Sequence, residues 1–100
     1  MTIAIITFDV KEPVTLADAK EMFEGSAPKF RNLPGLVRKY YIVSHDGKTV
    51  GGVYHWESLE IAKNTYSDEW RKRVVASYGA EPNLRYFDAP VIIDNQAASA

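Results

Sequence analysis

Apolar residues follow one another almost without interruption at the start of the chain. Residues 3–10 form a run of this kind, which predicts a strand covered on both faces rather than one with a wet side. Side chains alternate along a strand, so Thr7 and Asp9 share one face, and that face is a candidate wall for a cavity. In the alternative interpretation, Thr7 simply packs and Asp9 lies in water at the end of the strand.

Residues 36–56 predict a β-hairpin. Two runs rich in β-branched and aromatic side chains flank the pair Asp46-Gly47, which suits a tight turn because glycine readily adopts a positive φ. The second run contains Gly51 and Gly52. A glycine pair inside a strand predicts a bulge or, as the alternative, a close approach of another backbone or of a ligand.

The segment between these strands has helical periodicity. Thr15 is suited to cap a helix that begins at Leu16. Spacings of three and four then give one apolar stripe that we expect to pack in the core: Leu16, Ala19, Met22, Phe23, Ala27 and Phe30. Gly25 and Pro28 predict a kinked or irregular helix near them, which should end before Pro34.

Two further helical pieces and a last strand follow the hairpin. Ser58 and Ser67 are suited to cap the helices, and Gly79 is placed to end the second one. Residues 83–88 predict a strand that continues beyond a proline as residues 91–93, with the proline at an edge or a bend.

The order strand, helix, strand, strand, helix, strand predicts an α+β fold of the ferredoxin-like βαββαβ type, with an antiparallel sheet and helices on one face. We expect a single domain over residues 1–95 and a disordered tail over residues 96–100, which are small and polar. The strands are apolar on both sides, yet helices in this order cover only one face of the sheet. The sequence therefore predicts a homodimer, in which a second subunit covers the other face.

Composition and charge narrow the functional classes. The hydrophobic share of 46% and the charged share of 25% are those of a globular protein, which argues against a disordered or membrane-spanning chain. Basic and acidic residues are interspersed and nearly balanced at a net charge of −1, so no nucleic-acid or anionic-lipid surface is predicted. Without cysteine and without a signal-like start, the expected compartment is the cytoplasm.

Histidine is scarce. His45 falls in the predicted hairpin turn and His55 in the strand after it, and two histidines are too few for a metal site made of histidines alone. No glycine-rich loop precedes a helix to bind a phosphate, so we expect no metal, flavin or heme cofactor. His55 is a candidate catalytic residue because it titrates near neutral pH, and a structural role is the alternative.

Lys39 is the second candidate catalytic residue, because it lies in a largely apolar strand. We expect it to share a face with Val37, Tyr41 and Val43, where an ammonium group is costly unless it is paired or reaches water. It could stabilise an anionic phenolate or peroxide, or it could form a salt bridge across a dimer or extend into solvent. Four aromatic residues are candidates to bind a flat ligand, although each could be a core residue: Tyr54, Trp56, Tyr66 and Trp70.

Several short motifs match those of a known family. They are Leu33-Pro34-Gly35-Leu36, then Lys39, then Gly51-Gly52-Val53-Tyr54 and Trp56-Glu57-Ser58. The chain resembles the YdhR-like mono-oxygenases of the dimeric α+β barrel superfamily, from its first strand to Phe87-Asp88. The resemblance implies that two subunits pair sheet against sheet, each with a small-molecule cavity between its sheet and its own helices. It also implies oxygenation of a small aromatic, polyketide- or quinol-like compound without a bound metal or flavin.

The same fold serves several functions, so the site chemistry has to choose among them. Heme-degrading relatives need a ligating histidine in the second helical layer, and residues 58–78 contain none. Two hypotheses remain after this step. The chain is either a cofactor-independent mono-oxygenase or a non-catalytic homodimer that binds a small ligand or has a structural role.

Overall fold

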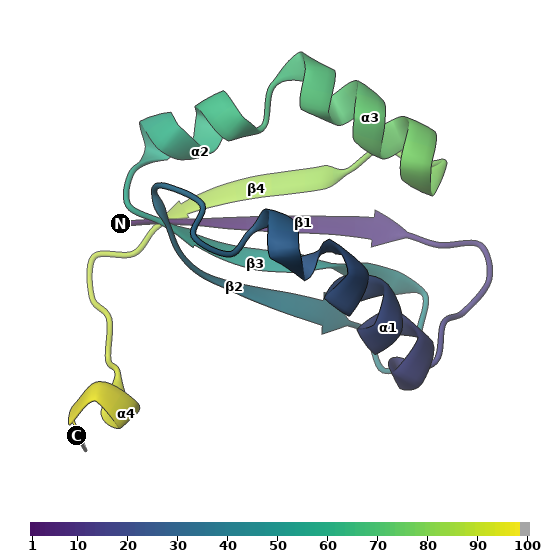
Figure 1. The fold of residues 1–100 in the computed structure, drawn as a ribbon, viewed down its shortest axis with the longest axis horizontal. Helices are drawn as coiled ribbons and strands as arrows, with labels where there is room; N and C mark the ends of the chain where they lie inside the picture. The colour runs from purple at the N-terminus through teal and green to yellow at the C-terminus, as the bar shows by residue number, and fades with distance from the viewer. Residues whose placement is uncertain (99–100) are drawn as a thin grey trace.

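A computed structural model describes residues 1–98 of the chain, in which one antiparallel sheet carries its main helices on one face (Figure 1). The elements are β1 (Thr2–Asp9), α1 (Leu16–Ser26), a 3-10 turn (Ala27–Lys29), β2 (Leu36–Val43), β3 (Thr49–Trp56), α2 (Leu59–Thr65), α3 (Asp68–Tyr78), β4 (Asn83–Asp88) and α4 (Asn95–Ala98). The strand order is β2-β3-β1-β4, and all neighbouring pairs are antiparallel. The predicted α+β ferredoxin-like fold is confirmed.

The predicted starts and stops of the elements follow local chemistry. Thr15, Ser58 and Ser67 cap α1, α2 and α3, each accepting a hydrogen bond from the amide three residues ahead at 3.1, 3.2 and 3.2 Å. Gly79 ends α3 with φ 69°, and Gly47 has φ 73° in the hairpin turn. Both positions use a conformation that other residues adopt only at a cost.

Helix α1 buries less of its apolar stripe than the sequence predicted. Ala19 is buried and Phe23 is half-buried, but Leu16 is 74% exposed and Met22 is 41% exposed. The helix packs on β2, which is the edge strand of the sheet, so part of the stripe has no sheet beneath it. The irregularity predicted near Pro28 takes the form of a 3-10 turn that follows the regular helix and precedes Pro34, whereas Gly25 lies within the regular helix.

The glycine pair of β3 does not form the predicted bulge. Gly51 and Gly52 keep a continuous register with both neighbouring strands, and the irregular step lies in β2, between Leu36 and Arg38. The alternative of a close backbone approach is confirmed, because a Cβ atom on Gly51 would overlap the carbonyl oxygen of Ile6.

The last strand is shorter than predicted. β4 ends at Asp88, which pairs with Thr2 at the start of β1. The amide of Ala89 still donates a hydrogen bond to the carbonyl of Met1 at 3.0 Å, and Pro90, which follows, has no N–H to continue the ladder. Residues 91–93 are therefore not a strand, and their side chains are exposed. Of the tail that we expect to be disordered, residues 96–98 complete the helical turn α4, and residues 99–100 lie outside the described part of the chain.

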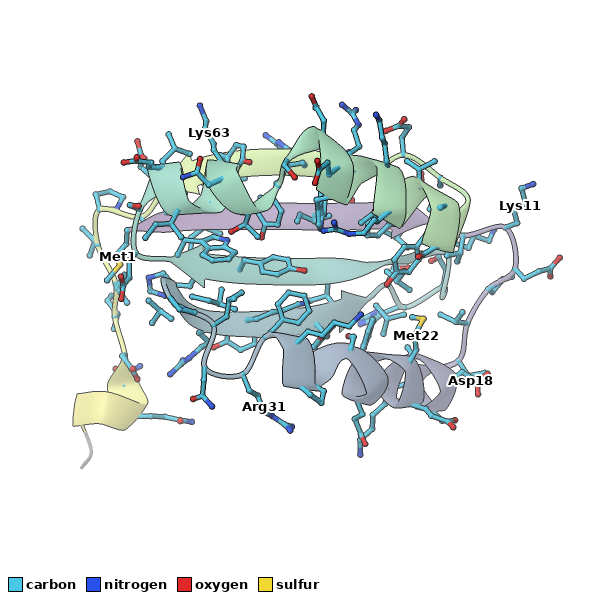
Figure 2. The ribbon with its side chains drawn as sticks, turned by 45° about the horizontal axis from the view of Figure 1, so that its top comes forward. Met1, Lys11, Asp18, Met22, Arg31 and Lys63 are labelled. Carbon is cyan, nitrogen blue, oxygen red and sulfur yellow. The ribbon has the colours of Figure 1, made fainter. Side chains whose placement is uncertain are left out.

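The two faces of the sheet have different surroundings. Helices α1, α2 and α3 cover one face, which holds the core residues of β1 and β3 (Figure 2): Ala4, Ile6, Phe8, Val50, Tyr54 and Trp56. Thr7 and Asp9 belong to the other face, since they alternate with the core residues Ile6 and Phe8, so they do not line a cavity beneath helices α1, α2 and α3. Asp9 is exposed and accepts a hydrogen bond from Thr49 at 3.2 Å. Among the described residues, no helix is long and apolar enough to cross a membrane.

Candidate functional site

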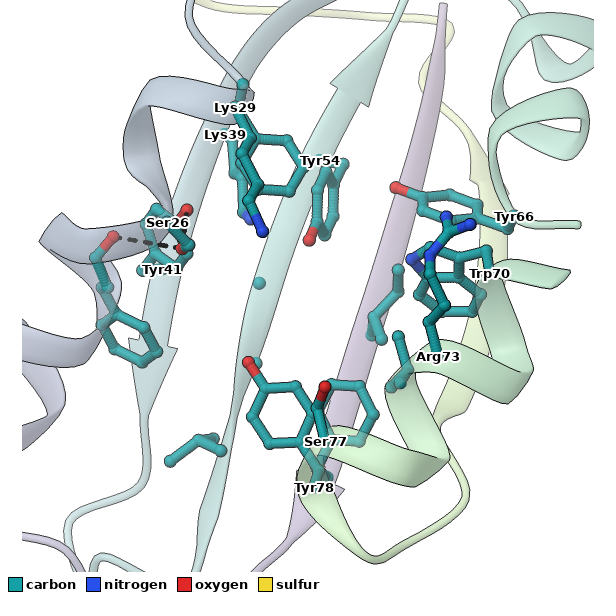
Figure 3. Close-up of a pocket in the computed structure, with 18 of the residues that line it drawn as sticks. Ser26, Lys29, Lys39, Tyr41, Tyr54, Tyr66, Trp70, Arg73, Ser77 and Tyr78 are labelled. Atoms are coloured by element: carbon teal, nitrogen blue, oxygen red, sulfur yellow. Dashed lines mark hydrogen bonds between the residues drawn. The ribbon is translucent and has the colours of Figure 1, made fainter.

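A cavity of about 460 Å³ lies between the sheet and the helices, open toward the gap between α1 and α3 (Figure 3). Its lining is largely aromatic and hydroxylated. The side chains that matter below are Phe30, Lys39, Tyr41, Tyr54, Tyr66 and Trp70, with Lys29, Arg73, Ser77 and Tyr78 also in the lining. A cavity of this size and character suits a small aromatic molecule.

Gly52 keeps the floor of this cavity open. A Cβ atom at this position would lie 2.9 Å from the Tyr54 ring and 3.1 Å from Cε of Lys39. The absence of a side chain therefore makes room for both of these groups on the helix-facing side of β3. The second glycine of the pair thus shapes the site, whereas Gly51 serves the approach of the neighbouring strand.

The ammonium group of Lys39 is surrounded by aromatic rings. Its Nζ lies 3.4 Å from the centroid of the Phe30 ring, 3.8 Å from that of Tyr41 and 4.4 Å from that of Tyr54. The register of β2 on β3 creates this arrangement, because it places Lys39 directly opposite Tyr54. Ring faces attract a cation, so they support the charged form without a carboxylate.

Lys39 forms no ion pair with any described carboxylate. Burial of the amine lowers the pKa of Lys39 to about 7, because the charged form loses water. Ammonium and neutral amine are therefore both populated near neutral pH. Lys39 shares its face with Tyr41, as predicted, but not with Val37, because the irregular step in β2 turns Val37 to the opposite face, where it is 50% exposed.

Tyr54, Tyr66 and Trp70 line the cavity, and Trp56 does not. Trp56 is fully buried beneath it and donates a hydrogen bond from Nε1 to the hydroxyl of Tyr66 at 3.0 Å. Rings of Tyr66 and Trp70 lie 4.9 Å apart. Burial raises the pKa of Tyr54 and of Tyr66 above its usual value, so both hydroxyls remain protonated at neutral pH and can donate to a ligand.

The cavity contains residues that sequence reasoning missed. Tyr41 makes a 2.7 Å hydrogen bond with Ser26 of α1, and its ring stacks on Phe23 at 4.6 Å. Strand alternation already placed Tyr41 beside Lys39, and this was the available signal. No comparable signal exists for Lys29 and Arg73, because they reach the cavity only through the packing of separate elements on the sheet.

His55 lies away from this cavity. It belongs to the opposite face of β3, where it pairs with Ile3 and Arg38 on the neighbouring strands. Its Nε2 atom is buried without a hydrogen-bond partner in the described part of the chain, and it lies in a hollow between the sheet and the C-terminal segment. The structure does not bring His55 together with Lys39. His45 is exposed in the hairpin turn, and the described residues contain no cluster of three or more His, Cys, Asp or Glu suited to a metal ion.

The solved structures that share this fold include the following three. One is a monooxygenase of Streptomyces coelicolor in complex with the ligand nanaomycin D. Its sequence is 23% identical to this one, and the two structures superpose with a TM-score of 0.66 over 92% of this chain and 89% of that monooxygenase chain. The second is a protein from Deinococcus radiodurans named as an antibiotic biosynthesis monooxygenase, which is 12% identical with a TM-score of 0.66 over 94% of this chain and 97% of its own.

The third is a protein from Bordetella bronchiseptica, also named as an antibiotic biosynthesis monooxygenase. It is 18% identical with a TM-score of 0.61 over 90% of this chain and 97% of its own. No protein-family model matches the sequence, and no curated protein matches it. The likeness therefore extends to the fold, which is that of the antibiotic biosynthesis monooxygenases.

Proposed function

We propose that this protein is a cofactor-independent mono-oxygenase of a small aromatic, polyketide- or quinol-like compound, of the YdhR-like type. The observation that carries the proposal is the position of Lys39, whose amine lies inside an aromatic cavity, has no carboxylate partner among residues 1–98 and has a pKa lowered to about 7. The three structures of the same fold support it, since each is named as a monooxygenase.

The cavity suits the first step of such a reaction, which is ionisation of a phenol. A hydroxylated ring fits among the rings of the lining, and the neutral amine of Lys39 takes the phenolic proton. The resulting ammonium then stabilises the phenolate, an electron-rich group that reacts directly with O₂. Tyr54 and Tyr66 can donate hydrogen bonds to other oxygens of the ligand, and Trp70 offers a flat wall.

The remaining steps balance without an external reductant. The ring carbon para to the phenolate oxygen bonds to O₂, and the ammonium of Lys39 protonates the distal peroxide oxygen. Loss of the proton from that carbon breaks the O–O bond, leaves a quinone carbonyl and releases the second oxygen atom as water. Phenol and O₂ thus give quinone and water, and the substrate supplies all the electrons. We assign no step to His55, because its ring lies on the opposite face of the sheet.

Oxygen uptake tests the proposal and separates it from the alternative of a non-catalytic ligand-binding or structural homodimer. Purified protein is mixed with 1-naphthol and other phenols that carry a hydrogen on the para carbon, while dissolved O₂ and quinone absorbance are followed, with and without a metal chelator. Uptake with stoichiometric quinone supports a mono-oxygenase. Saturable binding of the same compounds without uptake supports a binding protein instead.

Replacement of Lys39 tests whether this residue takes the phenolic proton. Lys39→Met should lower the turnover rate by roughly 10²-fold or more while the fold is retained. Lys48→Met removes the same charge from an exposed position outside the cavity and is the matched control. Equal activity of the wild type and Lys39→Met would overturn the assigned role.

A further inference from the structure

The charges around the cavity are all of one sign. Among the residues that the structure describes, its lining contains the cationic side chains Lys29, Lys39 and Arg73 and no Asp or Glu. The whole chain has twelve basic and thirteen acidic residues, so this asymmetry belongs to the cavity and not to the protein. A cavity with one sign of charge and low-dielectric walls attracts ligands of the opposite sign.

Lys29 and Arg73 stand at the entrance on opposite walls. Lys29 ends the 3-10 turn that follows α1, and Arg73 belongs to α3 (Figure 3). Both are exposed, and neither forms an ion pair with a described carboxylate. The neighbouring cation Arg71 differs, because Glu81 binds its Nε at 2.7 Å. The charges of Lys29 and Arg73 thus remain available to a ligand.

We infer that the cavity selects an anionic aromatic ligand, one with a carboxylate beside its phenolic ring, and that Lys29 and Arg73 at the entrance bind this carboxylate. The inference deepens the proposed function, on which it rests for the aromatic nature of the ligand. The phenolic ring occupies the interior beside Lys39, and the carboxylate remains at the wet entrance, where it keeps part of its hydration. Arg73 can bind a carboxylate in a two-pronged manner that a lysine cannot reproduce.

The expected size of the preference follows from the exposure of these residues. An exposed ion pair contributes little, and two of them together should favour the acid over a neutral analogue by about fivefold to tenfold. The preference should shrink as salt is added, because exposed charges are screened. The apolar ring system is the same in the acid and in the neutral analogue, so its contribution to the binding free energy does not affect the preference between them.

Binding to 1-hydroxy-2-naphthoate and to its neutral amide, 1-hydroxy-2-naphthamide, tests the inference. The titration is done without oxygen and is followed by calorimetry and by tryptophan fluorescence, to which Trp70 of the cavity lining contributes beside Trp56. The double variant Lys29→Met/Arg73→Met should bind acid and amide within about twofold of each other. Lys20→Met/Lys72→Met is the matched control, because it removes one exposed cation from each of α1 and α3 outside the cavity lining.

Each outcome decides the inference separately from the proposed reaction. The inference is supported if the wild type and the control variant bind the acid more tightly than the amide and the cavity variant Lys29→Met/Arg73→Met loses this preference. Equal binding of acid and amide to the wild type overturns it, as does a preference that survives in the cavity variant or an absence of binding at millimolar concentration. Preferential binding of the acid without any oxygen uptake would support the inference about the ligand and contradict the proposed mono-oxygenase activity.

Discussion

Lys39 and Tyr54 face each other across β2 and β3, and Nζ of the lysine lies 4.4 Å from the centroid of the tyrosine ring. The pair shows how a cation is kept in an apolar cavity. Gly52 leaves the space that both side chains occupy, and the rings of Phe30 and Tyr41 provide further π faces. These contacts lead to predictions about stability, pH dependence and cavity shape.

Lys39 should make the protein more stable as the pH rises above neutrality. The pKa of Lys39 is about 7 in the folded protein and near 10.4 in an unfolded chain, so between these values the unfolded state binds more protons. The free energy of unfolding therefore rises with pH in this window. The slope should be less than the one-proton limit of about 1.4 kcal/mol per pH unit, because the side chain of Lys39 retains contact with water. Urea unfolding between about pH 7 and about pH 9 measures the slope.

Lys39→Met is the control for that slope. It removes the titrating group and should give a smaller pH dependence over the same window. Near pH 7 and below, it should also be at least as stable as the wild type, since a desolvated charge without a carboxylate partner is lost. An identical slope in both proteins would show that the lysine keeps its ordinary pKa.

Activity should follow the neutral form of Lys39. If the amine takes the phenolic proton, kcat/KM rises with pH up to about 7 and then levels off, because the free base is the active form. Lys39→Arg keeps the positive charge but cannot release its proton. We expect this variant to lose turnover by about 10²-fold at all pH values, and steady-state rates across pH measure both effects. Retained activity in Lys39→Arg would show that only the charge is needed.

Gly52→Ala should narrow the cavity. The added methyl group would press on the ring of Tyr54 and the stem of Lys39, and overpacking of this kind costs about 1–3 kcal/mol. Ligand affinity and the melting temperature should both fall. Gly25→Ala in α1 is the control, because nothing lies within 4 Å of the new Cβ atom and the helix should gain about 0.5–1 kcal/mol. Ligand affinity unchanged in Gly52→Ala would contradict this account of the cavity floor.

Tyr66→Phe should destabilise the fold beneath the cavity. The hydroxyl of Tyr66 accepts the hydrogen bond of Trp56 Nε1, and without it a buried donor is left unpaired at a cost of about 1–3 kcal/mol. Chemical unfolding measures this loss. Tyr86 is half-buried and its hydroxyl accepts no bond from Trp56, which bonds Tyr66 instead, so Tyr86→Phe should have a smaller effect. Equal losses in the two variants would refute the role of the Trp56–Tyr66 bond.

The open face of the sheet predicts a homodimer. Tyr40 and Phe87 are 54% and 39% exposed there, and helices α1, α2 and α3 lie on the opposite face. A specific dimer should bury more than ~1,000 Å². Light scattering at micromolar concentration should give twice the mass of the chain, and Tyr40→Glu should shift the protein toward the monomer. A wild-type monomer under these conditions would exclude this role of the face.

The sequence by itself determined the elements and their order. The caps at Thr15, Ser58 and Ser67, the turn at Gly47 and the stop at Gly79 depend on chemistry within a few residues, and each lies where it was predicted. The order of the elements then restricts the fold to very few arrangements, because connections between neighbouring elements are short and follow fixed rules. Alternation along β2 also placed Lys39 on the same face as Tyr41.

Only the tertiary structure decided which residues meet. It placed Thr7 and Asp9 on the face opposite helices α1, α2 and α3, turned His55 away from Lys39 and ended the last strand at Asp88, just before Pro90. Local patterns cannot show this, because burial and pairing depend on segments distant in sequence. The convergence of Lys29 from the α1 side and Arg73 from α3 on one cavity has the same origin, since the distance between two helices is set by what packs on the sheet between them.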